Sequence, residues 1–344
     1  AGAEVNAATW TDWTYYYENA PKNALPLLIE LEADRMSNLV LREPQVRSEK
    51  EVVANERKLR VEDDIEGRAL EHLYATAFRR HPYRWPTIGW MEDIRSFTVE
   101  DCRRFYRTHY APNNAAIIIA GDFSERQALS LIQEHYGHLS PARDIDTTPR
   151  PKEPAQRSER VFRIAAPTPT DKVLIGYHAP PFADSDTPVL TVANEVLFGG
   201  RSSRLYRLFC VDEEIALSVR GAVSPFVDPG LFEIWISLRE GKRKEDAVAL
   251  LDREVARLAA DGPTDVELEK AINQIELSFL YGMETPGGKA EQLGFYETVV
   301  DDGATAFDRL DAYRRVTAGH VKRAVGKYLR PSRRTRVEIT ESAT

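Results

Sequence analysis

Apolar and polar residues in the first half of the chain follow two different periods. Val5, Ala7 and Thr9 alternate with their neighbours, and residues 14–17 form a second β-favouring run, which predicts two strands. The short apolar run at residues 115–120 predicts a third strand. Apolar residues at helical spacing predict helices over residues 24–39, 47–67, 68–78, 98–110 and 124–136.

The second half repeats this order of elements. Residues 141–160 hold several prolines and charges and almost no apolar side chain, which indicates a linker. Strands are predicted over residues 160–166, 172–178, 216–223, 231–238 and 335–339, and helices over residues 188–197, 203–209, 244–260, 263–281 and 317–328. The sequence therefore predicts an α+β fold of two similar domains, residues 1–140 and 161–344, each a mostly antiparallel sheet with helices packed on one face.

Composition narrows the function classes. The formal net charge of −8 argues against nonspecific binding of nucleic acid and leaves soluble substrates open. No apolar run is as long as a membrane span. The two cysteines, Cys102 and Cys210, are far apart and form neither a disulfide framework nor a zinc knuckle, so they leave the compartment open.

Two glutamates stand out in the predicted helix at residues 47–67, for which Ser48 and Glu51 offer a capping box. Glu49 and Glu56 are seven residues apart, so they lie two turns apart on nearly one face, which also carries Val52, Val53 and Leu59. A carboxylate on an apolar face is costly unless it is paired, protonated or bound to a metal. The same spacing is also that of two solvated glutamates at the edge of an acidic helix.

Several segments resemble one family. VNAATWTDWTYYYE, LLIELEADRM and EKEVVANER in the first half, together with AIIIAGDF, LFGGRSSRLYRLF and GKAEQLGFYE further on, are similar to the zinc peptidases of the insulinase and pitrilysin type. The resemblance covers essentially the whole chain, and its most specific block is residues 6–57. It implies a zinc metalloendopeptidase that cleaves peptides or unfolded proteins by metal-activated water.

The resemblance also assigns roles to residues. The matching glutamate, Glu56, would be the third Zn²⁺ ligand, and Glu49 would lie beside the metal and support it. The family's inverted motif His-x-x-Glu-His would lie upstream of Ala1, and with it the general-base glutamate, so no catalytic residue is expected in this chain. A chain that opens inside a strand pattern looks truncated in its first domain, and we expect it to be inactive on its own.

Asn6 and Ala7 match the strand edge that pairs with an extended peptide in this family. Backbone hydrogen bonds along such an edge supply affinity without demanding a particular sequence. Without the resemblance, the same residues describe an ordinary edge strand in which Asn6 caps a turn.

The second half lacks a pair that complete members of the family carry. An Arg and a Tyr, seven residues apart, bind the substrate backbone and support the oxyanion, but Cys210 and Leu217 occupy the matching positions here. The resemblance thus implies a heterodimer in which a homologous partner supplies the Arg and Tyr, as in two-subunit bacterial relatives, with a lean toward the periplasm. The rival reading is a non-catalytic scaffold or core subunit of the same fold.

The histidines of this chain offer weaker candidates. His81 lies near Trp85, His135 and His138 are three residues apart on one predicted helix, and His178 ends a strand. No carboxylate pattern completes a site around any of them, so we interpret them as surface or core histidines.

Overall fold

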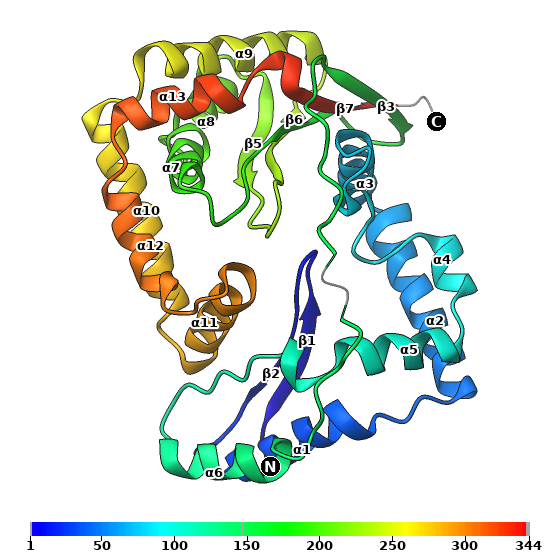
Figure 1. Ribbon diagram of the computed structural model, residues 1–344. Helices are drawn as coiled ribbons and strands as arrows, with labels where there is room; N and C mark the ends of the chain where they lie inside the picture. The colour runs from blue at the N-terminus through cyan, green and yellow to red at the C-terminus, as the bar shows by residue number, and fades with distance from the viewer. Residues whose placement is uncertain (1, 146–147, 342–344) are drawn as a thin grey trace. The chain divides into compact units, whose positions relative to one another are not determined.

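The computed structural model of the protein describes residues 2–145 and 148–341 (Figure 1). Its elements group into two units, each assembled from three stretches of the chain. Unit 1 comprises residues 1–58, 87–149 and 282–304, and unit 2 comprises residues 59–86, 150–281 and 305–344. The division into domains 1–140 and 161–344 stays a prediction. Residues 146–147 of the predicted linker lie outside the described residues.

A β-hairpin and several helices make up unit 1. Strands β1 (Glu4–Thr9) and β2 (Thr14–Asn19) pair antiparallel, with Ala7 opposite Tyr16. The helices are α1 (Leu25–Asn38), α2 (Glu43–Arg57), α4 (Met91–Ser96), α5 (Val99–His109), α6 (Glu125–Tyr136) and α11 (Pro286–Val300). The two strands, α1, α5 and α6 confirm the predictions from periodicity, and Thr98 and Asp101 form the capping box of α5.

The hairpin uses its two faces differently. On one face the Tyr16 hydroxyl lies 2.6 Å from the Tyr110 hydroxyl, and Arg35 of α1 stacks over the Tyr16 ring. On the other face, Tyr15 donates to Glu291 of α11 over 3.2 Å. Helices therefore hold both faces, while the outer edge of β1 is unpaired among the described strands.

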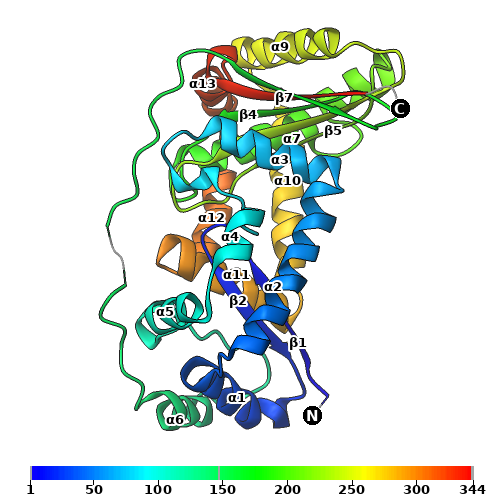
Figure 2. The same ribbon diagram turned by 90° about the vertical axis from the view of Figure 1, so that its right-hand side faces the viewer.

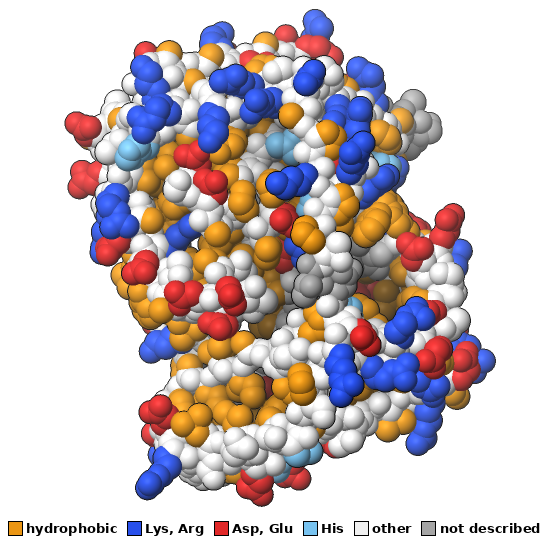
Figure 3. Space-filling view, viewed as in Figure 1, with side chains coloured by type: hydrophobic (Ala, Val, Ile, Leu, Met, Phe, Trp, Pro, Cys, Tyr) orange, Lys and Arg blue, Asp and Glu red, His pale blue; other side chains and the backbone are white. Residues whose placement is uncertain are grey.

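The predicted strand at residues 115–120 is wrong. This apolar run has no strand structure, and Ile117 is 44% exposed. A strand needs a neighbour that takes up its backbone hydrogen bonds, and β1 and β2 pair only with each other in the described part of unit 1. In Figure 3, hydrophobic side chains reach the surface around α6 and the hairpin, which fits a unit with few fully buried residues.

Unit 2 is built on a five-stranded sheet of order β3-β7-β4-β6-β5. The strands are β3 (Arg160–Ala166), β4 (Lys172–His178), β5 (Ala216–Val223), β6 (Leu231–Leu238) and β7 (Arg334–Glu341). Among the described strands of this sheet, only β3 and β7 pair in parallel. The predicted strands and the mostly antiparallel sheet are therefore confirmed.

Helices cover both faces of this sheet. Successive side chains of β4 point to opposite faces, and those of residues 173–177 are all buried, so both faces are covered. Val173, Ile175 and Tyr177 pack into a core with helices α7 (Asp186–Phe198), α9 (Lys244–Asp261) and α13 (Ala318–Tyr328). Leu174 packs on the other side with α3 (Ile65–Ala77). Figures 1 and 2 both show α9 and α13 side by side. The remaining helices are α8 (Arg204–Tyr206), α10 (Asp265–Gly282) and α12 (Thr305–Arg314).

The second half of the predicted linker is docked on unit 2. Glu153 Oε2 accepts hydrogen bonds from the backbone amides of Arg79 and Arg80, at 2.9 and 2.8 Å, just beyond α3. Arg150 donates to Asp228 over 2.7 Å. In the described part of the chain, no helix has both the length and the apolar character that crossing a membrane requires.

Candidate functional site

Helix α2, which carries both candidate glutamates, begins earlier than the sequence suggests. Pro44 lies in its first turn, where its missing N–H costs nothing, and the Arg42 amide donates to Gln45 Oε1 over 3.2 Å. The predicted capping box of Ser48 and Glu51 is therefore wrong, because both residues lie inside the helix.

The predicted continuous helix over residues 47–67 is also interrupted. Residues 58–62 form a π-helical turn after α2, and α3 then starts with Asp64 as its cap. The Asp64 carboxylate accepts from the Gly67 amide over 2.8 Å, which caps α3 as a helix of its own.

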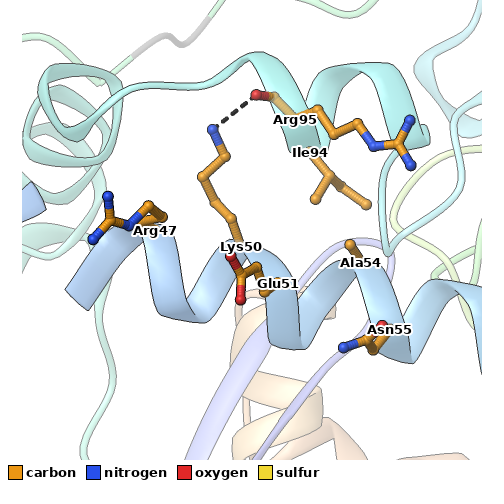
Figure 4. A pocket seen from close by; sticks show the side chains of 7 residues that line it. All are labelled: Arg47, Lys50, Glu51, Ala54, Asn55, Ile94 and Arg95. Atoms are coloured by element: carbon orange, nitrogen blue, oxygen red, sulfur yellow. Dashed lines mark hydrogen bonds between the residues drawn. The ribbon is translucent and has the colours of Figure 1, made fainter. Parts of the chain in front are cut away.

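One side of α2 packs against α4 and the loop that follows it. Lys50 Nζ donates to the carbonyls of Arg95 and Phe97, both at 2.8 Å. The Lys50–Arg95 bond is drawn in Figure 4. A cavity of about 510 Å³ lies beside it. The side chains that line this cavity are Arg47, Lys50, Glu51, Ala54, Asn55, Ile94 and Arg95.

Arg57 extends the same packed side. Its guanidinium is buried, donates to the Gly89 carbonyl over 2.8 Å and lies over the Trp90 ring. Lys50 and Arg57 are themselves seven residues apart, like Glu49 and Glu56. Residues seven apart lie on nearly one side of a helix, so the spacing of these two cations in the sequence indicates the side of α2 that packs.

Glu49 and Glu56 lie roughly 100° around the helix from this packed side. Glu49 is exposed and Glu56 is half-buried. Val52, between them, is 55% exposed and Leu59 is 71% exposed, so the apolar residues that share this face with the glutamates do not form a buried stripe. The helix rests on α4 through Lys50 and Arg57 instead.

The zinc that the resemblance implies is not accommodated by the residues present. Within residues 2–145 and 148–341, no three His, Cys, Asp or Glu side chains come together as a metal site. Structural and catalytic zinc sites need at least three protein ligands, usually with imidazole or thiolate among them. Glu56 therefore offers at most one carboxylate ligand.

The histidine with the most extensive contacts is structural. His81 is buried, and its Nδ1 accepts from the Tyr83 amide over 3.2 Å. Its Nε2 therefore carries the proton and donates to Asp228 over 3.2 Å. The Asp228 carboxylate loses solvation through burial, but its hydrogen bonds from Arg150 and His81 outweigh that loss and lower its pKa.

The outer edge of β1 presents Ala7 to solvent. The Trp10 amide donates to the Trp13 carbonyl over 2.8 Å, which sets the alternation of the ladder. Counting along the register, Ala7 and Tyr16 form a non-hydrogen-bonded pair, so the N–H and C=O of Ala7 point away from β2. The Asn6 side chain accepts from the Ala7 amide over 2.8 Å, inside the strand rather than at a turn.

Neither Cys210 nor Leu217, the two residues expected at the Arg/Tyr positions, can donate a strong hydrogen bond. Cys210 is buried in the π-helical turn at Arg207–Asp212, and burial raises the pKa of its thiol. Leu217 is 60% exposed on β5. These two residues belong to unit 2, whereas Asn6, Ala7 and α2 belong to unit 1.

Two family models match this chain. The model described as insulinase (peptidase family M16) matches residues 1–89, and the one described as peptidase M16 inactive domain matches residues 96–275. The fold and these matches define a chain of the insulinase class of proteins. The protein belongs to peptidase family M16.

Curated relatives agree with this assignment, and a solved structure shares the fold. The chain is 28% identical over 348 residues to the zinc protease PqqE of Helicobacter pylori, covering 98% of this chain and 76% of that protein. It is 26% identical over 303 residues to the probable mitochondrial-processing peptidase subunit beta of Schizosaccharomyces pombe, covering 85% and 66%. The crystal structure of a protease from Helicobacter pylori superposes with a TM-score of 0.93 at 24% identity, covering 98% and 82%.

Proposed function

We propose that this chain is the zinc-binding subunit of a metalloendopeptidase that cleaves peptides or unfolded proteins. The observation that carries the proposal is the placement of Glu49 and Glu56 on a side of α2 that does not pack against α4. Relatives named zinc proteases support it. In this proposal Glu56 is one zinc ligand and Glu49 orients the site, while the imidazole ligands come from outside the 344 residues.

Zinc content tests this assignment. In the full-length protein encoded by the gene, Glu56→Gln should abolish bound zinc, measured by mass spectrometry after dialysis. Glu49→Gln should weaken zinc affinity by about 10- to 100-fold, as loss of a supporting group does. Glu51→Gln removes a carboxylate from the same helix on a different side and should change nothing. Full zinc occupancy in Glu56→Gln would remove Glu56 from the ligand set.

The outer edge of β1 is the proposed substrate site. The N–H and C=O of Ala7 point away from β2 and can hydrogen-bond an extended peptide as an added strand, in which case the peptide takes the place of Asn6 Oδ1 on the Ala7 N–H. Such recognition reads backbone rather than side chains, so it suits substrates in an extended, unfolded conformation.

A homologous partner subunit is part of the same proposal. Cys210 and Leu217 leave this chain without a donor pair for the oxyanion, and one relative is itself named a subunit. A partner bearing Arg and Tyr at the matching positions would complete the site. The test compares cleavage of unfolded casein by the purified full-length protein before and after the partner is added. Full activity without any partner rules out the heterodimer.

A non-catalytic scaffold subunit is the second candidate. The match of residues 96–275 to a model described as an inactive domain favours it, as does the lack of a metal cluster among the described residues. The two candidates differ in one measurement, because a scaffold would bind no zinc in its full-length form. A periplasmic location belongs to the peptidase proposal and is tested by cell fractionation.

A further inference from the structure

Two glutamates and one arginine meet where the hairpin of unit 1 lies against α1. Glu18 is on β2, and Glu32 and Arg35 lie one turn apart on α1. The side chains of Glu18 and Glu32 are only 14% and 22% exposed. When both carboxyl groups are ionised, the cluster holds two negative charges for one guanidinium, which is costly in a site largely closed to water.

Arg35 serves the two carboxylates unequally. Its Nη2 lies 2.8 Å from Glu32 Oε1 but 4.0 Å from Glu18 Oε1, which is too far for a hydrogen bond. Glu18 Oε1 is closed to solvent, and no N–H or O–H group within residues 2–145 and 148–341 donates to it. A buried acceptor without a donor forfeits the hydrogen bonds that it accepts in water. Glu18 therefore needs a donor that its ionised surroundings do not supply.

A proton on Glu32 supplies this donor. The Glu32 carboxyl lies within hydrogen-bonding reach of Glu18. Once protonated, it donates an O–H to Glu18, while its other oxygen still accepts from Arg35. Two carboxylates that share a site hold one proton between them, because both cannot ionise without repulsion. Burial and the contact with Glu18 accordingly raise the pKa of Glu32 to about 7, against the opposing charge of Arg35.

The other groups around the pair do not change charge near neutral pH. Tyr136 of α6 lies close to both carboxylates, and burial together with their charge raises the pKa of its hydroxyl to about 12. Burial likewise raises the pKa of Tyr16, whose ring centre lies 5.0 Å from the Arg35 guanidinium. In the short turn before α1, Lys22 pairs with Asp122 over 2.7 Å. Of these groups, only the carboxyl pair gains or loses a proton near pH 7.

We propose that Glu18 and Glu32 form a proton-operated latch, which holds the β1–β2 hairpin on α1 while the two carboxyl groups share one proton and loosens it when that proton leaves to water. Glu18 lies opposite Val5 in the ladder, so the latch acts at the end of the hairpin near Glu4 and Asn19. Above neutral pH, Glu18 loses its donor and the two carboxylates repel each other. The latch involves neither α2 nor zinc, so it is independent of the proposed peptidase function.

Hydrogen exchange of the full-length protein tests the latch. The amides of Tyr17 and Asn19 donate across the ladder to β1, because the Val5–Glu18 pair between them is a non-hydrogen-bonded one. Their protection factors, which divide out the intrinsic exchange rate at each pH, report local opening of this end. Protection should fall by up to about tenfold between pH 6 and pH 8, because a raised pKa adds stability that is lost as the pH rises through 7. Mass spectrometry of peptides that cover residues 14–19 measures the change.

Single amide substitutions supply the decisive comparison. Glu32→Gln and Glu18→Gln each place an amide, which can donate at any pH, beside the remaining carboxylate. Both variants should therefore retain at pH 8 the protection that the unsubstituted protein shows at pH 6. Glu30→Gln, at an exposed position on a different side of α1, should keep the full pH response. The proposal fails if the unsubstituted protein is equally protected at both pH values. It also fails if either glutamine variant still loses protection at pH 8, since a shared proton requires both carboxyl groups.

Discussion

The guanidinium of Arg204 holds the carboxylate of Glu267 by two parallel hydrogen bonds and reaches Glu254 of α9 over 3.3 Å. One nearly buried cation thereby ties α8 to α9 and α10. Arg204→Ala should lower the free energy of unfolding by about 3–5 kcal/mol, because it leaves carboxylates without their main partner in a site largely closed to water. Arg204→Lys should recover part of this loss, since an ammonium cannot form both bonds in parallel.

Urea unfolding of the two variants measures this effect. Arg207→Ala, which removes an exposed arginine next in the chain after α8, is the control and should change the free energy of unfolding by less than about 0.5 kcal/mol. Equal effects of Arg204→Ala and Arg207→Ala would show that the Arg204 pair behaves as a surface ion pair.

The same contact sets a pH dependence. Hydrogen bonding from Arg204 lowers the pKa of Glu267 to about 2, against its ordinary 4.5. A depressed pKa in the folded state adds stability that is fully present above about pH 4.5 and is lost as the pH falls toward 2. This part of the acid sensitivity should disappear in Arg204→Ala.

Glu32 on α1 has the opposite pH dependence. Burial and a hydrogen bond with Glu18 raise its pKa to about 7, although Arg35 Nη2 lies 2.8 Å from its Oε1. A raised pKa in the folded state adds stability that is fully present below about pH 4.5 and is lost as the pH rises through 7. Glu32→Gln should therefore be more stable than the unsubstituted protein at pH 8 and nearly equal to it at pH 5.

Urea unfolding at the two pH values checks this prediction. Glu30→Gln, at an exposed position of the same helix, should show no such difference. If Glu32→Gln is the less stable protein at pH 8, the attraction of Arg35 outweighs the repulsion from Glu18. The ionised Glu32 carboxylate then stabilises the folded protein, contrary to the prediction.

Glu214 holds a backbone conformation that suits glycine. Its φ is +46°, two residues before β5 begins, and its side chain is exposed. The left-handed conformation costs about 1–2 kcal/mol in a residue with a Cβ, and glycine's extra freedom when unfolded costs about 0.5–1 kcal/mol. Glu214→Gly should therefore stabilise the protein by up to about 1 kcal/mol in urea unfolding.

The neighbouring residue is a matched control. Glu213 is equally exposed but has a φ of −97°, so Glu213→Gly gains no relief and should destabilise the protein by about 0.5–1 kcal/mol. Destabilisation of the same size by Glu214→Gly would mean that the turn carries no strain.

Much of the fold of unit 2 could be predicted, because its strands bury apolar side chains and this leaves a local pattern in the sequence. The bounds of β3 to β6 follow from their own residues, with no help from distant segments. The apolar run at residues 115–120 has the same local pattern without being a strand, since pairing depends on a neighbour that its sequence does not specify. The sequence pattern does not predict helix α11, because this helix contains Gly287, Gly288 and Gly294 and buries only Tyr296 and Val299.

The candidate site was predictable to a similar extent. Spacing alone places Glu49 and Glu56 at one angle around α2, because the helical period fixes that angle. It does not show which angle faces solvent. That depends on α4, more than thirty residues further along the chain, whose loops accept hydrogen bonds from Lys50 and Arg57.

The outer edge of β1 gives a test of substrate binding that leaves the metal untouched. The N–H of Ala7 points away from β2, so Ala7→Pro removes a donor at the open edge while it spares the ladder. If an extended peptide pairs here, kcat/KM for peptide cleavage by the assembled full-length enzyme should fall by up to about tenfold, the equivalent of one hydrogen bond. Thr14→Pro removes an outward N–H from β2, at the other edge of the same hairpin, and should leave kcat/KM unchanged. Equal losses in both variants would mean that proline damages the hairpin and that Ala7 does not bind the peptide.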